Sequence, residues 1–201
     1  MTSFIVFEGL DGSGKSTQAR ALLRRLRRHD FAALLTHEPG GTPLGEYLRR
    51  WLKHSPGLSP IAELSLCVAA RAQLIEKVVR PALDSGVTVV SDRYTASTVA
   101  YQAYGRGLDL ALVQQLNLAA TEGLVPNLTL LLDLPPEAAL ARRRNPGTDT
   151  IEAAPLEFHR RVRESYLAQA AKDSSRWLVL DATLAPRRLS RLIWAEVRPL
   201  L

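Results

Sequence analysis

Short apolar runs alternate along the chain with longer segments of helical spacing. The runs are rich in β-branched residues and cover Phe4–Phe7, Ala32–Thr36, Val87–Val90, Leu128–Leu132 and Trp177–Leu180. Runs that are apolar almost throughout, instead of alternating with polar positions, indicate strands buried on both faces of a parallel sheet. The pattern therefore predicts an α/β fold with a doubly wound, five-stranded parallel sheet flanked by helices.

The segments between these runs predict helices. A long one is expected at Pro60–Asp84, because Ser59 can cap its start, Pro60 suits its first turn and Gly86 lies just beyond its end. Pro81 is a candidate interruption of its last turn. Further helices are expected at Leu108–Glu122, Pro136–Arg144, Leu156–Lys172 and Pro186–Val197.

The length and the loops predict one domain. The chain has 201 residues, within the usual range for a single core, and shows no repeat, low-complexity tract or long linker. Turn-forming residues are concentrated at Asn145–Thr150, between two expected helices. We therefore expect a single domain spanning residues 1–201, with a lid segment at about residues 142–152.

Composition places the protein among ordinary globular chains with anionic partners. Hydrophobic residues make up 46% and charged residues 23%, and the net charge of +6 comes almost entirely from arginine. The arginines at 24, 25, 27 and 28 share a predicted helix face. A solvated surface is the expected explanation and nucleic-acid binding the alternative, so we do not expect nucleic acid as a partner.

Cysteine usage and hydropathy bear on location. The single cysteine, Cys67, excludes an intramolecular disulfide and lies in an apolar stretch, which favours a reducing compartment. The first apolar run is too short for a signal-peptide core, and no run reaches the length of a membrane span. A cytoplasmic protein with no membrane partner is predicted.

The stretch FEGLDGSGKST follows the first apolar run and contains a complete G-x-x-x-x-G-K-[ST] pattern. Its glycines let successive backbone amides converge on phosphate oxygens at the start of a helix. Lys15 would reach the β- and γ-phosphates of ATP, and the Ser16 hydroxyl would bind Mg²⁺. The predicted ATP-binding residues are Gly9, Leu10, Asp11, Gly12, Ser13, Gly14, Lys15, Ser16 and Thr17.

A second polar cluster follows the third apolar run. Asp92 would lie at the carboxyl end of a buried strand, where ligands gather in open α/β sheets, and could hold Mg²⁺ directly or through water. Arg93 offers a planar fork for a phosphate group, and the alternative is an ion pair between the two side chains. The Asn-Lys-x-Asp pattern of GTPases is absent from the sequence.

Several further motifs follow one another along the chain, and together they resemble those of the bacterial type of thymidylate kinase. This family belongs to the P-loop nucleoside monophosphate kinases. The motifs are HEPGGT at 37–42, DRY at 92–94, AYQ at 100–102, YGRG at 104–107, PNLTLLLD at 126–133, FH at 158–159 and DA at 181–182. The resemblance spans almost the whole chain. It implies a P-loop kinase fold and ATP-dependent phosphorylation of dTMP to dTDP, for dTTP synthesis, with Mg²⁺, in a cytoplasmic homodimer. The long Pro60–Asp84 helix would contribute to the dimer interface.

The resemblance also implies an acceptor site. Its residues would be Asp11, Glu38, Arg49, Cys67, Arg71, Arg93, Ser97, Thr98, Tyr101 and Gln102. Asp11 would approach the sugar 3′-hydroxyl, and Arg49 and Arg93 the dTMP phosphate. Arg71 and Gln102 would contact the thymine.

Some of these assignments have structural alternatives. Arg71 lies in an otherwise apolar helix, where it could form a structural salt bridge instead of binding a ligand. Tyr101 and Gln102 could serve packing alone. Glu38 and Pro39 could form a plain turn, and their peptide bond is a candidate for the cis form. Cys67 stands where the family has a stacking phenylalanine, which would weaken the contact to the base.

Positive side chains are expected to carry the catalysis, because two polyanions must approach each other. The predicted catalytic residues are Lys15, Arg93, Arg142, Arg143 and Arg144. Bacterial-type members place an arginine in the lid where this chain has Thr150, so we expect one of the three consecutive arginines to replace it. They could instead stabilise the carbonyls at a helix end. No general base or covalent intermediate is needed.

Two other functions stay open on the sequence alone. The chain could be a kinase for another deoxynucleotide or for a deoxynucleoside, which a substrate panel would separate. It could also be a non-catalytic nucleotide-binding or nucleic-acid-binding module, which salt-sensitive DNA binding without turnover of any monophosphate would indicate.

Overall fold

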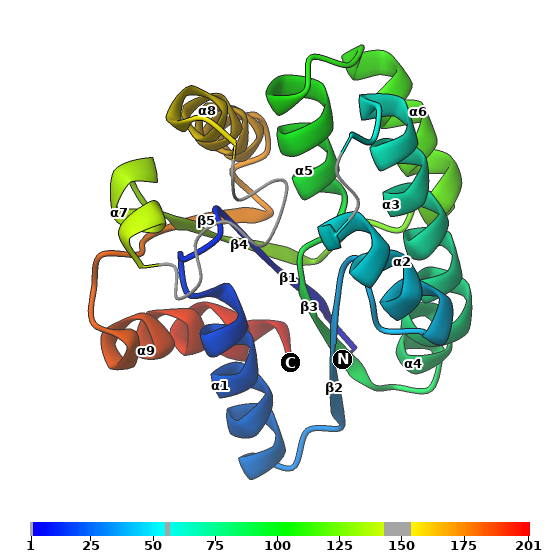
Figure 1. Ribbon diagram of the computed structural model, residues 1–201. Helices are drawn as coiled ribbons and strands as arrows, with labels where there is room; N and C mark the ends of the chain where they lie inside the picture. Colours follow the sequence, from blue (N-terminus) through cyan, green and yellow to red (C-terminus); the bar gives the residue numbers. More distant parts are fainter. Residues whose placement is uncertain (1, 55–56, 143–153) are drawn as a thin grey trace.

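A parallel five-stranded sheet forms the centre of the computed structural model, which describes residues 2–54, 57–142 and 154–201 (Figure 1). Its strands are β1 (Phe4–Glu8), β2 (Ala33–His37), β3 (Thr88–Asp92), β4 (Leu128–Asp133) and β5 (Trp177–Asp181), in the order β2-β3-β1-β4-β5. The predicted fold class is confirmed. Each strand continues one or two residues beyond its apolar run, to a polar residue at the carboxyl end, because backbone pairing extends past the apolar side chains.

Helices connect the strands. They are α1 (Lys15–Arg28), α2 (Pro43–His54), α3 (Pro60–Leu74), α4 (Arg80–Asp84), α5 (Thr95–Thr98), α6 (Leu110–Thr121), α7 (Pro136–Ala141), α8 (Leu156–Lys172) and α9 (Pro186–Val197). Two π-helical segments, η1 (Ile75–Val79) and η2 (Val99–Gly105), continue α3 and α5, and a short 3-10 turn, η3 (Arg198–Leu200), follows α9. The predicted bounds of α8 and α9 are confirmed.

Three predicted helices differ in detail. The long Pro60–Asp84 helix has a π-helical turn ahead of Pro81, because the proline ring lacks an N–H and crowds the carbonyl one turn earlier. Helix α6 begins two residues later than expected, since the Asp109 carboxylate accepts a hydrogen bond from the Leu112 amide at 2.8 Å and caps the helix. Helix α7 ends at Ala141, three residues short of the predicted end at Arg144.

Two helical segments were not predicted. Helix α2 starts with Pro43, and the Thr42 hydroxyl accepts a hydrogen bond from the Gly45 amide at 3.0 Å. Helix α5 with η2 covers Thr95–Gly105, where β-branched and aromatic residues weaken a helical pattern. Tertiary packing decides this segment, since the side chains at 99–103 are all buried.

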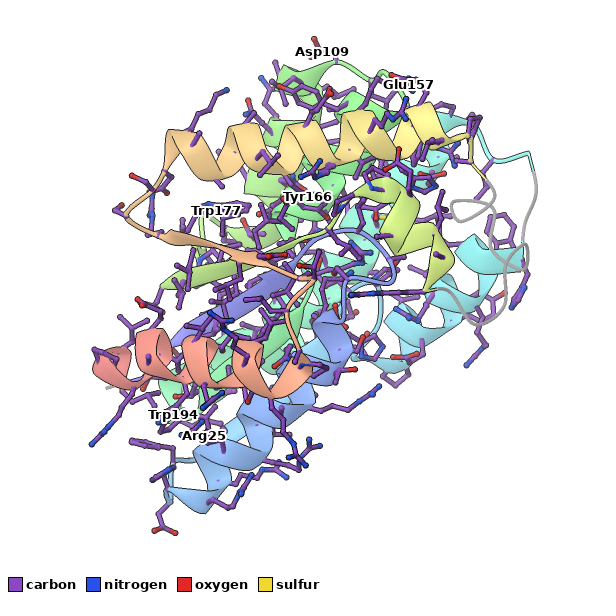
Figure 2. The ribbon with its side chains drawn as sticks, turned by 90° about the vertical axis from the view of Figure 1, so that its left-hand side faces the viewer. Arg25, Asp109, Glu157, Tyr166, Trp177 and Trp194 are labelled. Carbon is purple, nitrogen blue, oxygen red and sulfur yellow. The ribbon has the colours of Figure 1, made fainter. Side chains whose placement is uncertain are left out.

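Helices cover both faces of the sheet. Ile5 and Phe7 pack in one core with α1 and α9, whereas Phe4 and Val6 pack on the opposite face with the end of α3 and with η1. In Figure 2, α8 lies on one side of the sheet and α1 and α9 on the other. Because side chains alternate along a strand, Glu8 must point toward the layer that contains Phe4 and Val6.

The carboxyl ends of β1, β2 and β3 lie side by side, since β3 pairs with both of the others. The segments that leave these ends carry the glycine-rich loop, Glu38–Pro39 and Arg93, so three sequence motifs meet at one edge of the sheet. Within the described residues, none of the helices combines the length and hydropathy required to cross a bilayer.

Candidate functional site

The glycine-rich loop joins β1 to α1, as predicted. Gly9 has a φ of +136° and Gly12 a φ of +89°, in the left-handed region that side chains disfavour. A Cβ atom at Gly9 would also lie 2.5 Å from the carbonyl oxygen of Leu132 on β4. The loop therefore needs glycine for its backbone conformation and for its close approach to the sheet.

Lys15, the first residue of α1, is folded into this loop. Its side chain is 5% exposed, and Nζ donates hydrogen bonds to the carbonyl oxygens of Gly9 at 3.0 Å and Leu10 at 2.8 Å. Burial, with a smaller contribution from the positive charge of Arg93, lowers the pKa of Lys15 to about 8. Asp11 opposes this shift from 3.9 Å. The ammonium group is thus held by two backbone carbonyl oxygens of the loop at a cost in desolvation.

Ser16 and Asp92, the two predicted Mg²⁺ ligands, contact each other: the hydroxyl of Ser16 donates a hydrogen bond to the Asp92 carboxylate. Both are hard oxygen ligands of the kind that Mg²⁺ prefers. In the part of the chain that the structure describes, no three His, Cys, Asp or Glu side chains gather into a metal cluster. A Mg²⁺ ion held by this pair would take its other oxygens from water and phosphate, which is usual for this ion.

Two pockets open at this edge of the sheet. The first, the phosphate pocket, is lined by six of the nine predicted ATP-binding residues, namely Asp11, Gly12, Gly14, Lys15, Ser16 and Thr17, together with Asp92 and Arg142. Of the other three, Gly9 and Leu10 supply the carbonyl groups that hold Lys15. Ser13, which is also part of the loop, is buried.

The second pocket, the acceptor pocket, is lined by all ten residues predicted for the acceptor site, together with Pro39, Leu52 and Glu63. Asp11, Glu38, Arg49 and Arg93 line both pockets. The two spaces therefore meet beside two arginines, and a phosphoryl group could pass between molecules bound on either side.

The Arg93 guanidinium lies at this junction and is extensively hydrogen-bonded. Nη2 is 2.7 Å from Asp11 Oδ1, and Nη1 is 2.9 Å from Ser97 Oγ and 3.2 Å from the Tyr166 hydroxyl. Burial opposes its charge, but Asp11 and the surrounding groups hold the pKa of Arg93 well above its usual value. The alternative of an ion pair with Asp92 is wrong: Arg93 pairs with Asp11.

Arg71 forms the buried salt bridge that the sequence left as an alternative. Its Nε and Nη2 lie 2.7 and 2.6 Å from Glu38 Oε2, and Nη1 donates to Asn117 Oδ1 at 2.5 Å. Glu38 Oε1 has no hydrogen-bond partner among the described residues, and burial raises the pKa of this carboxyl group. The Glu38–Pro39 peptide bond is cis, as the sequence suggested. A ligand role for Arg71 stays a prediction, because it also lines the acceptor pocket.

Hydrogen bonds between buried polar side chains also connect Gln102 and Glu63, which line the acceptor pocket. Gln102 Nε2 donates to Glu63 Oε1 at 2.8 Å, and Arg106 lies 2.9 Å from Glu63 Oε2. Tyr101 lies beneath the Arg93 guanidinium, with a 5.0 Å separation between ring centroid and Cζ. Burial raises the pKa of the Cys67 thiol to about 12, so it faces the pocket as a neutral, weakly polar group.

Four polar residues that support the site were not predicted from the sequence: Glu8, Glu63, Asn117 and Tyr166. Glu8 and Tyr166 form hydrogen bonds among the groups that surround Arg93. Asn117 accepts a hydrogen bond from Arg71, and Glu63 accepts one from Gln102. A signal was available for Asn117, since an amide in an apolar helix is costly without a partner. A signal was also available for Glu8, because it directly follows an apolar run that predicts a buried strand.

Of the three lid arginines, the structure describes one. Arg142 follows α7, lines the phosphate pocket and donates a hydrogen bond from Nη1 to the carbonyl oxygen of Ala182 at 2.9 Å. Arg143, Arg144, Thr150 and most of the predicted lid at about 142–152 lie outside the described residues. The choice among the three arginines therefore stays a prediction.

Comparisons with known proteins agree with this geometry. The family model described as thymidylate kinase matches residues 7–193. Thymidylate kinase of Synechococcus sp. (strain JA-2-3B'a(2-13)) is 50% identical over 198 residues, covering 98% of this chain and 95% of that protein. Thymidylate kinase of Thermomicrobium roseum is 48% identical over 199 residues, with coverages of 98% and 95%. The crystal structure of thymidylate kinase from Ehrlichia chaffeensis has a TM-score of 0.81, with 31% identity and 98% coverage of both chains.

The lowered pKa of Lys15 predicts a pH-dependent stability. Below pH 8 the lysine is charged in both states, and folding bears the desolvation cost. Between the folded pKa of about 8 and the ordinary value of 10.5, only the unfolded chain keeps the proton, so the cost disappears as pH rises. Relative to Lys15→Met, the free energy of unfolding of the ligand-free wild type should rise by on the order of 3 kcal/mol across this window.

Urea denaturation of both proteins at pH 7, 8, 9 and 10.5 measures this difference. Lys172→Met, which removes an exposed lysine, is the control and should show no such trend. A constant difference between wild type and Lys15→Met at all four pH values would contradict the prediction.

Proposed function

The chain belongs to the thymidylate kinase family, and from this premise we propose which of its residues carry the ATP-dependent phosphorylation of dTMP to dTDP. The observation that carries the proposal is the junction of the two pockets, one lined by the glycine-rich loop and the other by the predicted acceptor residues. Arg49 and Arg93 line both spaces, as groups that hold two phosphates in line must do.

The phosphate pocket is proposed to bind the polyphosphate of ATP. Amides of the glycine-rich loop and the start of α1 would bind phosphate oxygens. Lys15 would leave its carbonyl partners for the β- and γ-phosphates, because a charge-assisted bond to phosphate is stronger than one to a neutral carbonyl. Ser16 and Asp92 are proposed to hold Mg²⁺, which would screen the phosphate charge when bound.

The acceptor pocket is proposed to bind dTMP. Arg49 and Arg93 would contact its phosphate, and Asp11, which lines both pockets, would approach the 3′-hydroxyl. The remaining predicted residues would surround the sugar and the base: Glu38, Cys67, Arg71, Ser97, Thr98, Tyr101 and Gln102. Support for Glu38 comes from its Oε1, a buried acceptor that has no hydrogen-bond partner among the described residues.

The transfer itself needs positioning and charge stabilisation. The dTMP phosphate is already nucleophilic near neutral pH, so no side chain has to remove a proton. Lys15 and Arg93 would stabilise the charge on the transferring group, and one of Arg142, Arg143 and Arg144 would add to it from the lid. The position of Arg142 on the phosphate pocket supports it as the first candidate.

We also propose a homodimer, to which α3 would contribute. Support comes from exposed apolar side chains on two helices that pack together: Ile61 on α3, 45% exposed, and Leu118 on α6, 62% exposed. A monomer in sedimentation at micromolar concentration would contradict this. The cytoplasmic location and the single domain spanning residues 1–201 stay predictions, the first resting on the lone Cys67.

A substrate panel tests the function. With ATP and Mg²⁺, dTMP should be phosphorylated fastest, and dUMP about tenfold more slowly because it lacks one methyl contact. Thymidine should react least, since it has no phosphate for Arg49 and Arg93. Product analysis that finds no dTDP would overturn the proposal, and unchanged turnover in EDTA would refute the Mg²⁺ site.

Replacement of Arg142 tests the lid assignment. Arg142→Ala removes a positive group from the phosphate pocket and should lower kcat by about tenfold or more, the usual range for one charged hydrogen bond. Arg187→Ala, which removes an exposed arginine of α9, serves as the control. Equal kcat values for the two variants would shift the role to Arg143 or Arg144.

A further inference from the structure

The carboxylate of Glu8 lies beneath the site in a fully buried position, 0% exposed. It is the last residue of β1 and points toward α8, whose Tyr166 reaches back to the sheet (Figure 2). Building on the proposed function, we infer that Glu8 and Tyr166 are positioning residues for the reaction: they hold the Arg93 guanidinium at the junction of the two pockets.

One oxygen of Glu8 fixes the backbone that follows Arg93. Oε1 accepts hydrogen bonds from the amides of Tyr94 at 2.8 Å and Ser97 at 3.2 Å. Arg93 itself has a φ of +80°, which is unfavourable for a residue with a long side chain. The carboxylate thus secures the chain immediately after a residue that would not hold this conformation alone.

The other oxygen acts through two hydroxyl groups. Oε2 accepts hydrogen bonds from Ser97 Oγ at 2.6 Å and from the Tyr166 hydroxyl at 3.0 Å. Arg93 Nη1 donates to the same two oxygens, at 2.9 and 3.2 Å. A hydroxyl has one proton and two lone pairs, so giving the proton to Glu8 leaves lone pairs that point to the guanidinium. The negative charge therefore orients Arg93 without touching it.

This arrangement keeps the Glu8 carboxylate from taking an N–H group of Arg93 directly, while Nη2 of Arg93 pairs with Asp11. A carboxylate paired directly with the guanidinium in bidentate geometry would occupy two of its N–H groups. Here hydroxyls stand between the two charges, and the guanidinium still lines both pockets. Burial raises the pKa of Glu8, whereas Arg93 and the surrounding donors favour its ionised form, so the carboxylate depends on the groups that it positions.

The matched pair Tyr166→Phe and Tyr94→Phe separates positioning from packing. Both tyrosines are nearly fully buried, at 1% and 2% exposure, and each hydroxyl makes a hydrogen bond. The Tyr94 hydroxyl donates to the carbonyl oxygen of Leu124 at 2.9 Å, and within the described part of the chain it makes no hydrogen bond to Arg93. Each substitution removes one buried hydroxyl and keeps the ring.

Steady-state kinetics with ATP and dTMP, with Tm as a check on folding, gives the first test. Tyr166→Phe should lower kcat by about tenfold, as expected for a lost bond to a charged group, while KM for ATP changes less than twofold. Tyr94→Phe should keep the wild-type kcat even if its Tm falls as far as that of Tyr166→Phe. Equal kcat values for the two variants would overturn the inference.

A double-mutant cycle gives the second test. If Tyr166 acts through Arg93, Tyr166→Phe should weaken dTMP binding when it is introduced into the wild type. It should not weaken dTMP binding further when it is introduced into Arg93→Ala. Glu8→Gln should show the same difference between the two backgrounds. Titration calorimetry yields these values even where Arg93→Ala is inactive. Equal losses in both backgrounds would refute the inference. A wild type that forms no dTDP would instead refute the proposed function, so the two failures are distinguishable.

Discussion

The structure depends on keeping one guanidinium charged and fixed where two anionic substrates must meet. Arg93 extends from the end of β3 into the junction of the two pockets, in a backbone conformation that arginine disfavours. Its hydrogen bonds reach the glycine-rich loop, α5 and α8. The ends of β1 and β3, which pair in the sheet, bring these segments together. The fold thus fixes the position of one positive charge, and the glycine-rich loop and the residues of the acceptor pocket lie around it.

Buried polar groups give the acceptor pocket its rigidity. Arg71 joins α3 to Glu38 and to Asn117 of α6, and Glu63 joins α3 to Gln102 of η2. Each of these groups would be costly in the core without its partner, so the pairs hold their helices at fixed separations. The glycine-rich loop is shaped differently, by the backbone conformations of its glycines. One half of the site is therefore made by side-chain pairs and the other by the backbone.

Much of the fold could be predicted from periodicity, because strands buried on both faces and long amphipathic helices carry strong local signals. The glycine-rich loop was readable for the same reason. Partners far apart in the chain were not: Arg93 pairs with Asp11 instead of its neighbour Asp92, and Tyr166 reaches Glu8 across 158 residues. Helix α5 with η2 was missed because its β-branched and aromatic residues weaken a helical pattern, whereas its side chains at 99–103 are all buried in the fold.

The central claim, that Arg93 is fixed to receive the acceptor phosphate, can be tested by binding alone. Titration calorimetry of dTMP and thymidine against wild type and Arg93→Ala isolates the contribution of the phosphate. Wild type should bind dTMP much more tightly than thymidine, and the ratio of the thymidine to the dTMP dissociation constant should fall at least tenfold in Arg93→Ala. An unchanged ratio would contradict this role of Arg93, because the acceptor phosphate would then be held elsewhere.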